Sequence, residues 1–309
     1  MNQLEVLLLF PGSDTSPAGN LLCETGNLIE TRKCTPQFPS LTYTRDAGTE
    51  VIAREVARQL GEEGVRPHVI ECHIHRSKVE TNRTLTEVAI QRRGQEAELV
   101  YNTFHSWIRA ALQWELKHCR EAGVLLIDLH GHGHPHEYIE LGFRLSAATL
   151  NNIAGEEEER RDWRRIVTSA ARHEFTMRHL LKRNFGSSNE AIRDCLIGPS
   201  SFSSCILTHF GSDPVLSSVK CVPSQNRIGP GKQGYYNGGW IVRSHAKLAR
   251  VDSVQIELPM SVRCQPNEAR EAAILALARA IRQFHGLHYL EADSETDRHV
   301  NGKDLSKTR

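Results

Sequence analysis

Four histidines stand together directly after the most apolar segment of the chain. Residues 124–129 are almost continuously apolar, which is typical of a strand buried on both faces. The segment runs into a glycine-containing loop with His130, His132, His134 and His136. In open α/β sheets, ligands bind just beyond the carboxyl ends of strands, and an imidazole there can bind zinc. We therefore predict a functional site at this strand end, with His130, the histidine nearest the strand, as its first residue.

A second polar segment follows a shorter predicted strand at residues 67–72. It contains Arg76, Asn82 and Arg83. The planar guanidinium of arginine can hold a carboxylate through two hydrogen bonds, and asparagine adds an amide donor. Taken alone, such a stretch is more often a solvated basic loop, so its meaning depends on what lies beside it.

A third candidate is the segment of residues 254–259. Its alternation puts Gln255 and Glu257 on one face of a predicted strand and the apolar residues between them on the other. A carboxylate at a strand end that faces a cleft can act as general base on a metal-bound water. A surface strand with a charged outer face is the alternative interpretation.

Short apolar runs that alternate with longer amphipathic ones must position these residues. This order is typical of an α/β fold with a mainly parallel or mixed central sheet and helices on both faces. We predict strands at 6–10, 67–72, 124–129, 240–242 and 251–258, helices at 51–60, 86–120 and 269–284, one or two surface helices within 156–182, and a long loop at 211–239.

Size and composition are those of an ordinary globular protein. The chain has 309 residues, of which 39% are hydrophobic and 24% charged. This suits a single α/β domain over residues 1–290. Residues 291–309 are charged and polar, and we expect them to be a disordered tail.

Charge and cysteine usage restrict the partners and the compartment. The formal net charge is +1, which gives no reason to expect nucleic acid or an anionic membrane as a partner. The eight cysteines form no C-x-x-C pair, which favours reduced thiols in a cytoplasmic protein. The first apolar run is short, contains Glu5 and lacks a basic flank, so it predicts neither a signal peptide nor a membrane span.

Several motifs together resemble one superfamily. The segment Val-Glu-Thr-Asn-Arg at 79–83 is similar to the segment of zinc carboxypeptidases in which Asn and Arg hold the substrate's terminal carboxylate. Ile-Asp-Leu-His at 127–130 resembles the strand that carries their third metal ligand, and Gln-Ile-Glu at 255–257 the strand that carries their catalytic Glu. The N-formylglutamate amidohydrolase group is the closer match, since it also resembles the chain, in the same order, at 45–49, 101–105, 140–143 and 235–240.

The resemblance implies a zinc carboxypeptidase-like (phosphorylase/hydrolase-like) fold. It also implies metal-assisted hydrolysis of an amide next to a carboxylate, with a small carboxylate-bearing molecule such as an N-acyl amino acid as substrate. A zinc ion would lower the pKa of a bound water and polarise the carbonyl. The implied roles are metal ligation by His130 and Asp46, with His132 as a further ligand, substrate binding by Arg76, Asn82 and Arg83, and activation of the water by Glu257.

The chain departs from this family at the first metal ligand. The family has a His in a Pro-His-Gly-Gly segment, and Ala18 stands at that position here; the alternative match at 10–13 also lacks His. A catalytic zinc normally has three protein ligands. A substitute ligand from His132, His134 or His105 would preserve a hydrolase. Otherwise we expect a catalytically impaired relative that binds a carboxylate-bearing small molecule or a peptide C-terminus.

Overall fold

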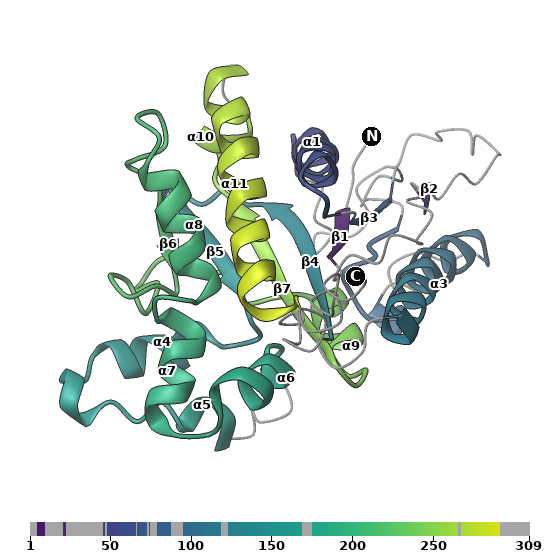
Figure 1. Ribbon diagram of the computed structural model, residues 1–309. Coiled ribbons are helices and arrows are strands. Elements are labelled where there is room, and N and C mark those ends of the chain that lie inside the picture. The colour runs from purple at the N-terminus through teal and green to yellow at the C-terminus, as the bar shows by residue number, and fades with distance from the viewer. Residues whose placement is uncertain are drawn as a thin grey trace, which may run out of the picture.

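The computed structural model describes residues 5–9, 21–22, 46, 48–65, 67–72, 74, 79–87, 95–118, 123–168, 175–264 and 267–290. These residues form a mixed sheet with helices on both faces, which confirms the predicted α/β class (Figure 1). The strand order is β2-β3-β1-β4-β7-β5-β6. The strands are β1 (Glu5–Leu9), β2 (Leu21–Leu22), β3 (His68–Glu71), β4 (Val124–Gly131), β5 (Tyr138–Gly142), β6 (Lys220–Val222) and β7 (Val251–Leu258).

The centre of the sheet fixes where the site can lie. Strand β7 is inserted between β4 and β5, which are neighbours in sequence but not in space. It runs parallel to β4 and antiparallel to β5. The carboxyl ends of β4 and β7 and the start of β5 therefore share one edge of the sheet. The histidine-containing loop from β4 to β5 crosses the end of β7 at that edge.

One face of the sheet is covered by a layer of long helices. Leu125 and Ile127 of β4 and Ile256 of β7 point into this layer and belong to the larger core cluster. In Figure 1 these helices lie on the viewer's side of the sheet. They are α1 (Thr49–Glu62), α8 (Phe202–Gly211) and α11 (Asn267–His288).

The opposite face carries a second core and, at its edge, the polar residues. Leu126 of β4 packs there in a cluster with Phe104 of α3 (Gln95–His118) and Ile241 of α9 (Trp240–His245). Because side chains alternate along a strand, the even-numbered residues of β4 point to this face. Residues beyond Leu126 on the same face are polar, so the hydrophobic core gives way to a site toward the strand end.

The segment at 240–242 is a correction to the sequence prediction. It forms the start of α9 and not a strand. Three apolar residues carry too little periodicity to separate a strand from a helix. The helix begins where Asn82 Oδ1 accepts a hydrogen bond from the backbone N–H of Ile241 at 2.9 Å, a contact between distant segments.

The region 156–182 also differs from prediction. The surface helices expected there are short pieces, and Trp163 and Ile166 are fully buried in the larger core. The charged residues before Trp163 led to the prediction of a solvent-exposed surface, and the buried Trp163 and Ile166 were not expected from the sequence. The remaining helical pieces of the described chain are α4 (Ala147–Ala154), η1 (Glu158–Arg160), α5 (Arg165–Thr168), α6 (Arg178–Leu180), η3 (Leu181–Phe185), α7 (Asn189–Ile197) and α10 (Met260–Arg263).

Most of the other predicted elements are confirmed. The strand at 251–258 and the helices at 51–60 and 269–284 are present, although Val51 is 43% exposed and does not belong to the buried face of α1. Within the predicted helix at 86–120, α3 spans Gln95–His118 and residues 86–87 are also helical, whereas residues 88–94 and 119–120 lie outside the described residues. Apart from β6, the 211–239 region is largely irregular, as predicted. The tail at 291–309 lies outside the described residues. No described helix has the length and apolar character needed to cross a bilayer.

Candidate functional site

Three titratable side chains form a row across the centre of the sheet. His130 of β4 is paired with Glu257 of β7, and Glu257 is paired with Glu140 of β5. Side chains directly opposite each other on neighbouring strands share a face, so all three point away from the α1–α11 layer. All three are buried. The row places one carboxylate, Glu257, between a histidine and a second carboxylate.

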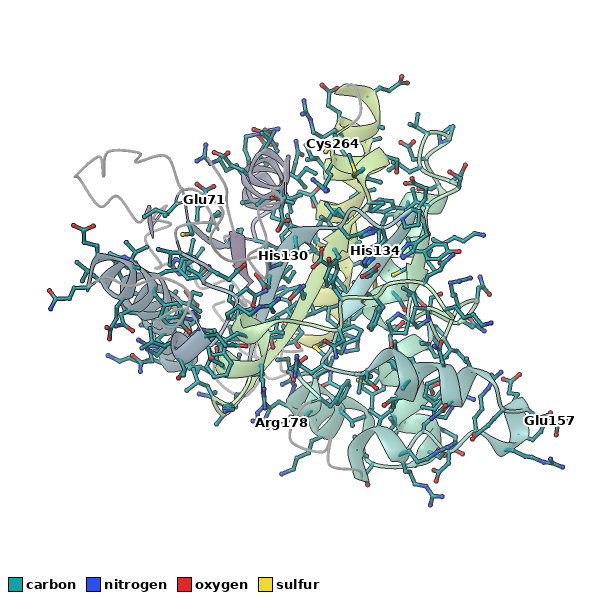
Figure 2. The ribbon with its side chains drawn as sticks, turned by 180° about the vertical axis from the view of Figure 1, so that it is seen from behind. Glu71, His130, His134, Glu157, Arg178 and Cys264 are labelled. Carbon is teal, nitrogen blue, oxygen red and sulfur yellow. The ribbon has the colours of Figure 1, made fainter. Side chains whose placement is uncertain are left out.

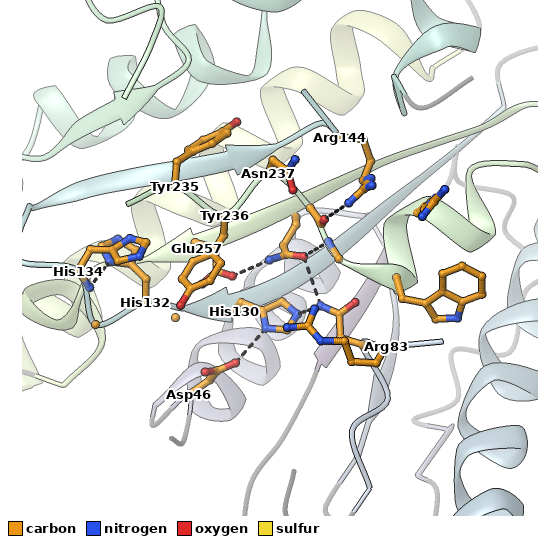
Figure 3. Close-up of a pocket in the computed structure, with 18 of the residues that line it drawn as sticks. Asp46, Arg83, His130, His132, His134, Arg144, Tyr235, Tyr236, Asn237 and Glu257 are labelled. Atoms are coloured by element: carbon orange, nitrogen blue, oxygen red, sulfur yellow. Dashed lines mark hydrogen bonds and ion pairs between the residues drawn. The ribbon is translucent and has the colours of Figure 1, made fainter. Parts of the chain in front are cut away.

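A cavity of about 1000 Å³ is lined by two members of this row, His130 and Glu257. Figure 3 shows His132 and His134 on one side of it, Arg83 on the other and His130 between them, and Figure 2 shows His130 and His134 beside the central strands. Every site residue predicted from the sequence lines it except Arg76, which, like Ala18, lies outside the described residues. The predicted residues that line it are Asp46, Asn82, Arg83, His130, His132 and Glu257.

The His130 imidazole lies between two buried carboxylates. Its Nδ1 is 2.9 Å from Asp46 Oδ2, and its Nε2 is 3.1 Å from Asp128 Oδ1. Burial on its own would lower the pKa of His130, but the carboxylates of Asp128 and Asp46 outweigh it and hold the pKa well above its usual value. The ring is therefore fixed in orientation from both sides.

Asp46 reaches His130 from the segment that begins α1. The backbone carbonyl of Asp46 accepts hydrogen bonds from the Thr49 hydroxyl at 2.8 Å and the Thr49 N–H at 3.3 Å. Gly48 between them has φ +89°, a conformation that side chains disfavour, and a Cβ there would meet the Arg263 carbonyl. The turn thus holds the Asp46 carboxylate against the end of β4.

Asn82 is fully engaged by the scaffold. Its Nδ2 lies 3.2 Å from His130 Nε2 and donates to Gln255 Oε1 at 3.4 Å, while its Oδ1 caps the start of α9 at Ile241. A side chain on Gly239 would collide with this amide. Asn82 therefore connects His130, β7 and α9, and its predicted contact with substrate stays a prediction.

Glu257 is held by its neighbour two positions before it. Gln255 accepts a hydrogen bond from the Gly239 N–H at 2.6 Å and donates one to Glu257 Oε1 at 2.5 Å. Burial raises the pKa of Glu257 to about 8. In its ionised form this side chain, which lines the cavity, can accept a proton from a group placed there.

Arginines line the end of the cavity away from the histidine-rich loop. Arg83, Arg144 and Arg243 all contribute to its wall. Arg144 follows β5 with φ 64°, a left-handed conformation that costs about 1 kcal/mol for a residue with a side chain. Its guanidinium donates to the Gly238 carbonyl at 2.7 Å. This end of the cavity is suited to an anionic group.

The histidine-rich loop surrounds Glu140. His134 Nδ1 lies 2.7 Å and His136 Nε2 3.2 Å from Glu140 Oε1. The Tyr236 N–H donates to the other carboxylate oxygen at 2.6 Å. Burial raises the pKa of Glu140 to about 8 and lowers that of His132 to about 4.

The donors at His130 fit part of a zinc site. A nitrogen and a carboxylate oxygen face each other there, and Asp128 on the far nitrogen matches the outer carboxylate that commonly orients a zinc-bound histidine. Among the described residues, the one group of three or more His, Cys, Asp or Glu ligand atoms within 4.8 Å is a different one, formed by His132, His136 and Glu140. The pair thus supplies two of three ligands, and Ala18 and its neighbours are not described.

The proposed substitutes for the missing ligand lie in different places. His132 and His134 line the cavity at the Glu140 side. His105 lines a separate cavity of about 250 Å³ and contacts His245 and the Thr81 carbonyl, each at 3.0 Å. His105 therefore belongs to the packing of α3 against α9.

Sequence reasoning assigned no role to several residues of this site. The strand period put Gln255 on the face of Glu257 without giving it a role, and the same period could have put Asp128 on the face of His130. Glu140 belongs to the segment 140–143 that resembles the amidohydrolase group, but its place beside Glu257 is known only from the pairing of β5 with β7. Arg144 and Arg243 carried no sequence signal.

Comparison of the chain with protein-family models, with curated proteins and with solved structures gave no match.

Proposed function

We propose that the chain is a metal-dependent hydrolase of amides that carry a carboxylate, such as N-acyl amino acids. The proposal rests on the cavity that contains Glu257 and the His130–Asp46 pair. The same cavity is lined at one end by Arg83, Arg144 and Arg243, here called the arginine wall. Hydrolysis of such an amide needs a proton acceptor, side chains that bind a metal ion, and a region that binds the substrate carboxylate. The resemblance to N-formylglutamate amidohydrolases points to the same reaction.

Each residue has a role in this reaction. His130 and Asp46 would hold a zinc ion, which supplies a Lewis acid and an acidified water. Glu257, held by Gln255, accepts the proton of the attacking water and can return it to the leaving amine. Arg83 at the far end of the cavity binds the substrate carboxylate and sets the distance from that carboxylate to the amide.

The test is release of free amino acid from N-formyl and other N-acyl amino acids by the zinc-supplemented chain. Glu257→Gln keeps the shape of the side chain but removes the base, so we expect turnover to fall by about 10²-fold or more. Glu157→Gln, on the exposed surface, is the matched control and leaves turnover unchanged.

A substitution in the arginine wall separates binding from chemistry. Arg83→Lys keeps a positive charge but loses the two-pronged geometry, so KM for the carboxylate substrate rises while kcat changes little. Arg160→Lys, on a side chain that is 79% exposed, is the control. Equal hydrolysis of substrates with and without the carboxylate would contradict the assigned role of Arg83.

The second candidate is a binding protein without turnover. The observation that favours it is that the described residues provide only two ligands at His130. Calorimetry with N-acyl amino acids that shows binding abolished by Arg83→Ala, together with turnover no faster than in Glu257→Gln, would identify this function and exclude the hydrolase.

A further inference from the structure

The loop between β4 and β5 brings three imidazoles to one buried carboxylate. The ring centroids of His132, His134 and His136 lie 5.0 to 5.2 Å from one another. Glu140, which is fully buried, contacts two of these rings. This cluster lies on the other side of Glu257 from the His130–Asp46 pair, because Glu257 is between His130 and Glu140 in the strand register.

The cluster has the spacing of a ligand set. One nitrogen from each of His132 and His136 and one oxygen of Glu140 lie within 4.8 Å of one another. Ligands about 2.0–2.2 Å from a single zinc ion are about 3–3.5 Å apart in a tetrahedral arrangement. The three ligand atoms are therefore close to the separation that a single zinc ion requires.

Hydrogen bonds from neighbouring residues orient the side chains that would bind the ion. The Tyr138 carbonyl lies 2.7 Å from His132 Nε2, which fixes a proton there and leaves Nδ1 as the atom for an ion. The Nδ1 lone pair accepts a hydrogen bond from the His134 N–H at 3.2 Å, and an ion would replace that hydrogen bond. The Tyr236 N–H donates to Glu140. Metal-bound histidines and carboxylates commonly have such outer partners.

One nitrogen in the cluster is unsatisfied by protein. His136 is 7% exposed, and its Nδ1 has no hydrogen-bond partner among the described residues. Its other nitrogen lies 3.1 Å from the Gly234 carbonyl and 3.2 Å from Glu140. Buried polar atoms without a partner are rare and often indicate a bound water or ion.

The backbone that carries the cluster is tied down on both sides. The His132 N–H donates to the Leu258 carbonyl at 3.1 Å, and the His132 carbonyl accepts from the Arg263 guanidinium at 3.0 Å. The ring of Tyr236 stacks on His134 at 4.7 Å. The donors are therefore presented by a supported loop, as a binding site requires.

We propose that His132, His136 and Glu140 bind a divalent transition-metal ion such as zinc, at a centre separate from the His130–Asp46 pair. Two imidazoles and one carboxylate suit zinc and its first-row neighbours, whereas magnesium and calcium prefer oxygen ligands. His134, which contacts Glu140 and lines the cavity, is placed to add a further ligand. The site goes beyond the proposed hydrolase and does not depend on it.

The test measures metal binding without any assay of turnover. Tag-free protein is stripped with chelator, loaded with zinc or cobalt(II), dialysed and analysed for metal per chain. We expect the His130→Asn variant to retain about one ion per chain and His136→Asn to retain about one fewer than the unsubstituted protein. His118→Asn, an exposed histidine on α3, is the matched control and retains the full amount.

Cobalt(II) absorption and thermal unfolding provide independent readouts. Zinc should raise the unfolding temperature of His130→Asn but raise that of His136→Asn by less, or not at all. If circular dichroism shows that His136→Asn does not fold, His132→Asn takes its place. Retention of no metal by the unsubstituted protein, or loss of the ion in His130→Asn, would overturn the proposal. Absence of amide hydrolysis with metal still retained would reject only the hydrolase.

Discussion

At the scale of single residues, the site depends on side chains that have two functions. Asn82 approaches His130 and at the same time caps the first turn of α9. Gln255 holds Glu257 and also accepts the Gly239 N–H. Because the same amides serve the chemistry and the fold, substitutions here should affect stability as well as activity.

Asn82→Ala tests this at one position. The substitution leaves the Ile241 N–H without its acceptor in a buried environment, so we expect the free energy of unfolding to fall by about 1–3 kcal/mol. Urea unfolding followed by circular dichroism measures the change. Asn102→Ala, at an exposed position of α3, should stay within about 0.5 kcal/mol of the unsubstituted protein. Equal effects of the two substitutions would contradict the structural role of Asn82.

At the scale of elements, α3 and α9 are joined by a buried pair of histidines. His105 Nδ1 and His245 Nε2 are 3.0 Å apart and the rings stack at 5.3 Å. Burial lowers the pKa of His105 to about 4 and that of His245 to about 3. Both residues are therefore neutral in the folded protein at neutral pH.

Acid should lower the free energy of unfolding through this histidine pair. The folded-state pKa values lie below the unfolded value of about 6.5, so the unfolded chain binds protons first as the pH falls. Stability should drop below about pH 6.5 and continue to drop toward pH 4, by up to about 1.4 kcal/mol per pH unit for each histidine. Urea unfolding between pH 7 and 4.5 measures the slope.

A variant isolates the contribution of the pair. His245→Gln removes one histidine with a lowered pKa, so the slope of stability against pH should become shallower. His118→Gln, at an exposed position, should leave the slope unchanged. An unchanged slope in His245→Gln would mean that other groups cause the acid sensitivity.

The elements differ in how far they could be predicted. Strand β7 was predictable because its eight residues are mostly apolar or alternate regularly, and the polar Gln255 and Glu257 fall on one face. Helix α9 was not predictable, because its start is set by Asn82, a residue far away in sequence. Glu140 was not assigned a role, because its place beside Glu257 comes from an antiparallel pairing that no local pattern contains.

At the scale of the whole molecule, most of the predicted site residues meet in one cavity although they come from distant parts of the chain. The strand-end rule could place His130 and Glu257 at one edge, since β4 and β7 run parallel. The grouping of the three arginines, and that of His132 with Glu140, could be recognised only from the three-dimensional structure.

The thiols provide a test of how the whole chain is packed around this cavity. Cys264 is exposed and lines the cavity, whereas Cys195, Cys205 and Cys221 are buried. Burial raises the pKa of Cys205 to about 11. An alkylating reagent should therefore modify Cys264 in the folded protein, and Cys195, Cys205 and Cys221 only after denaturation.

Peptide mass spectrometry over a time course measures these rates. A carboxylate ligand in the cavity should slow the modification of Cys264, and Cys264→Ser should remove only that signal. Modification of Cys221 as fast as Cys264 in native buffer would contradict the packing described here.

The insertion of β7 between β4 and β5 sets an order of assembly during synthesis. A ribosome releases β4, the histidine-rich loop and β5 long before residues 251–258 emerge. Until then the loop lacks the hydrogen bond from the His132 N–H to the Leu258 carbonyl, because Leu258 has not been synthesised. A nascent chain or a fragment cut before β7 therefore carries all four histidines of the site but neither Glu257 nor the strand that supports the loop. The cavity is complete only when its last strand is made.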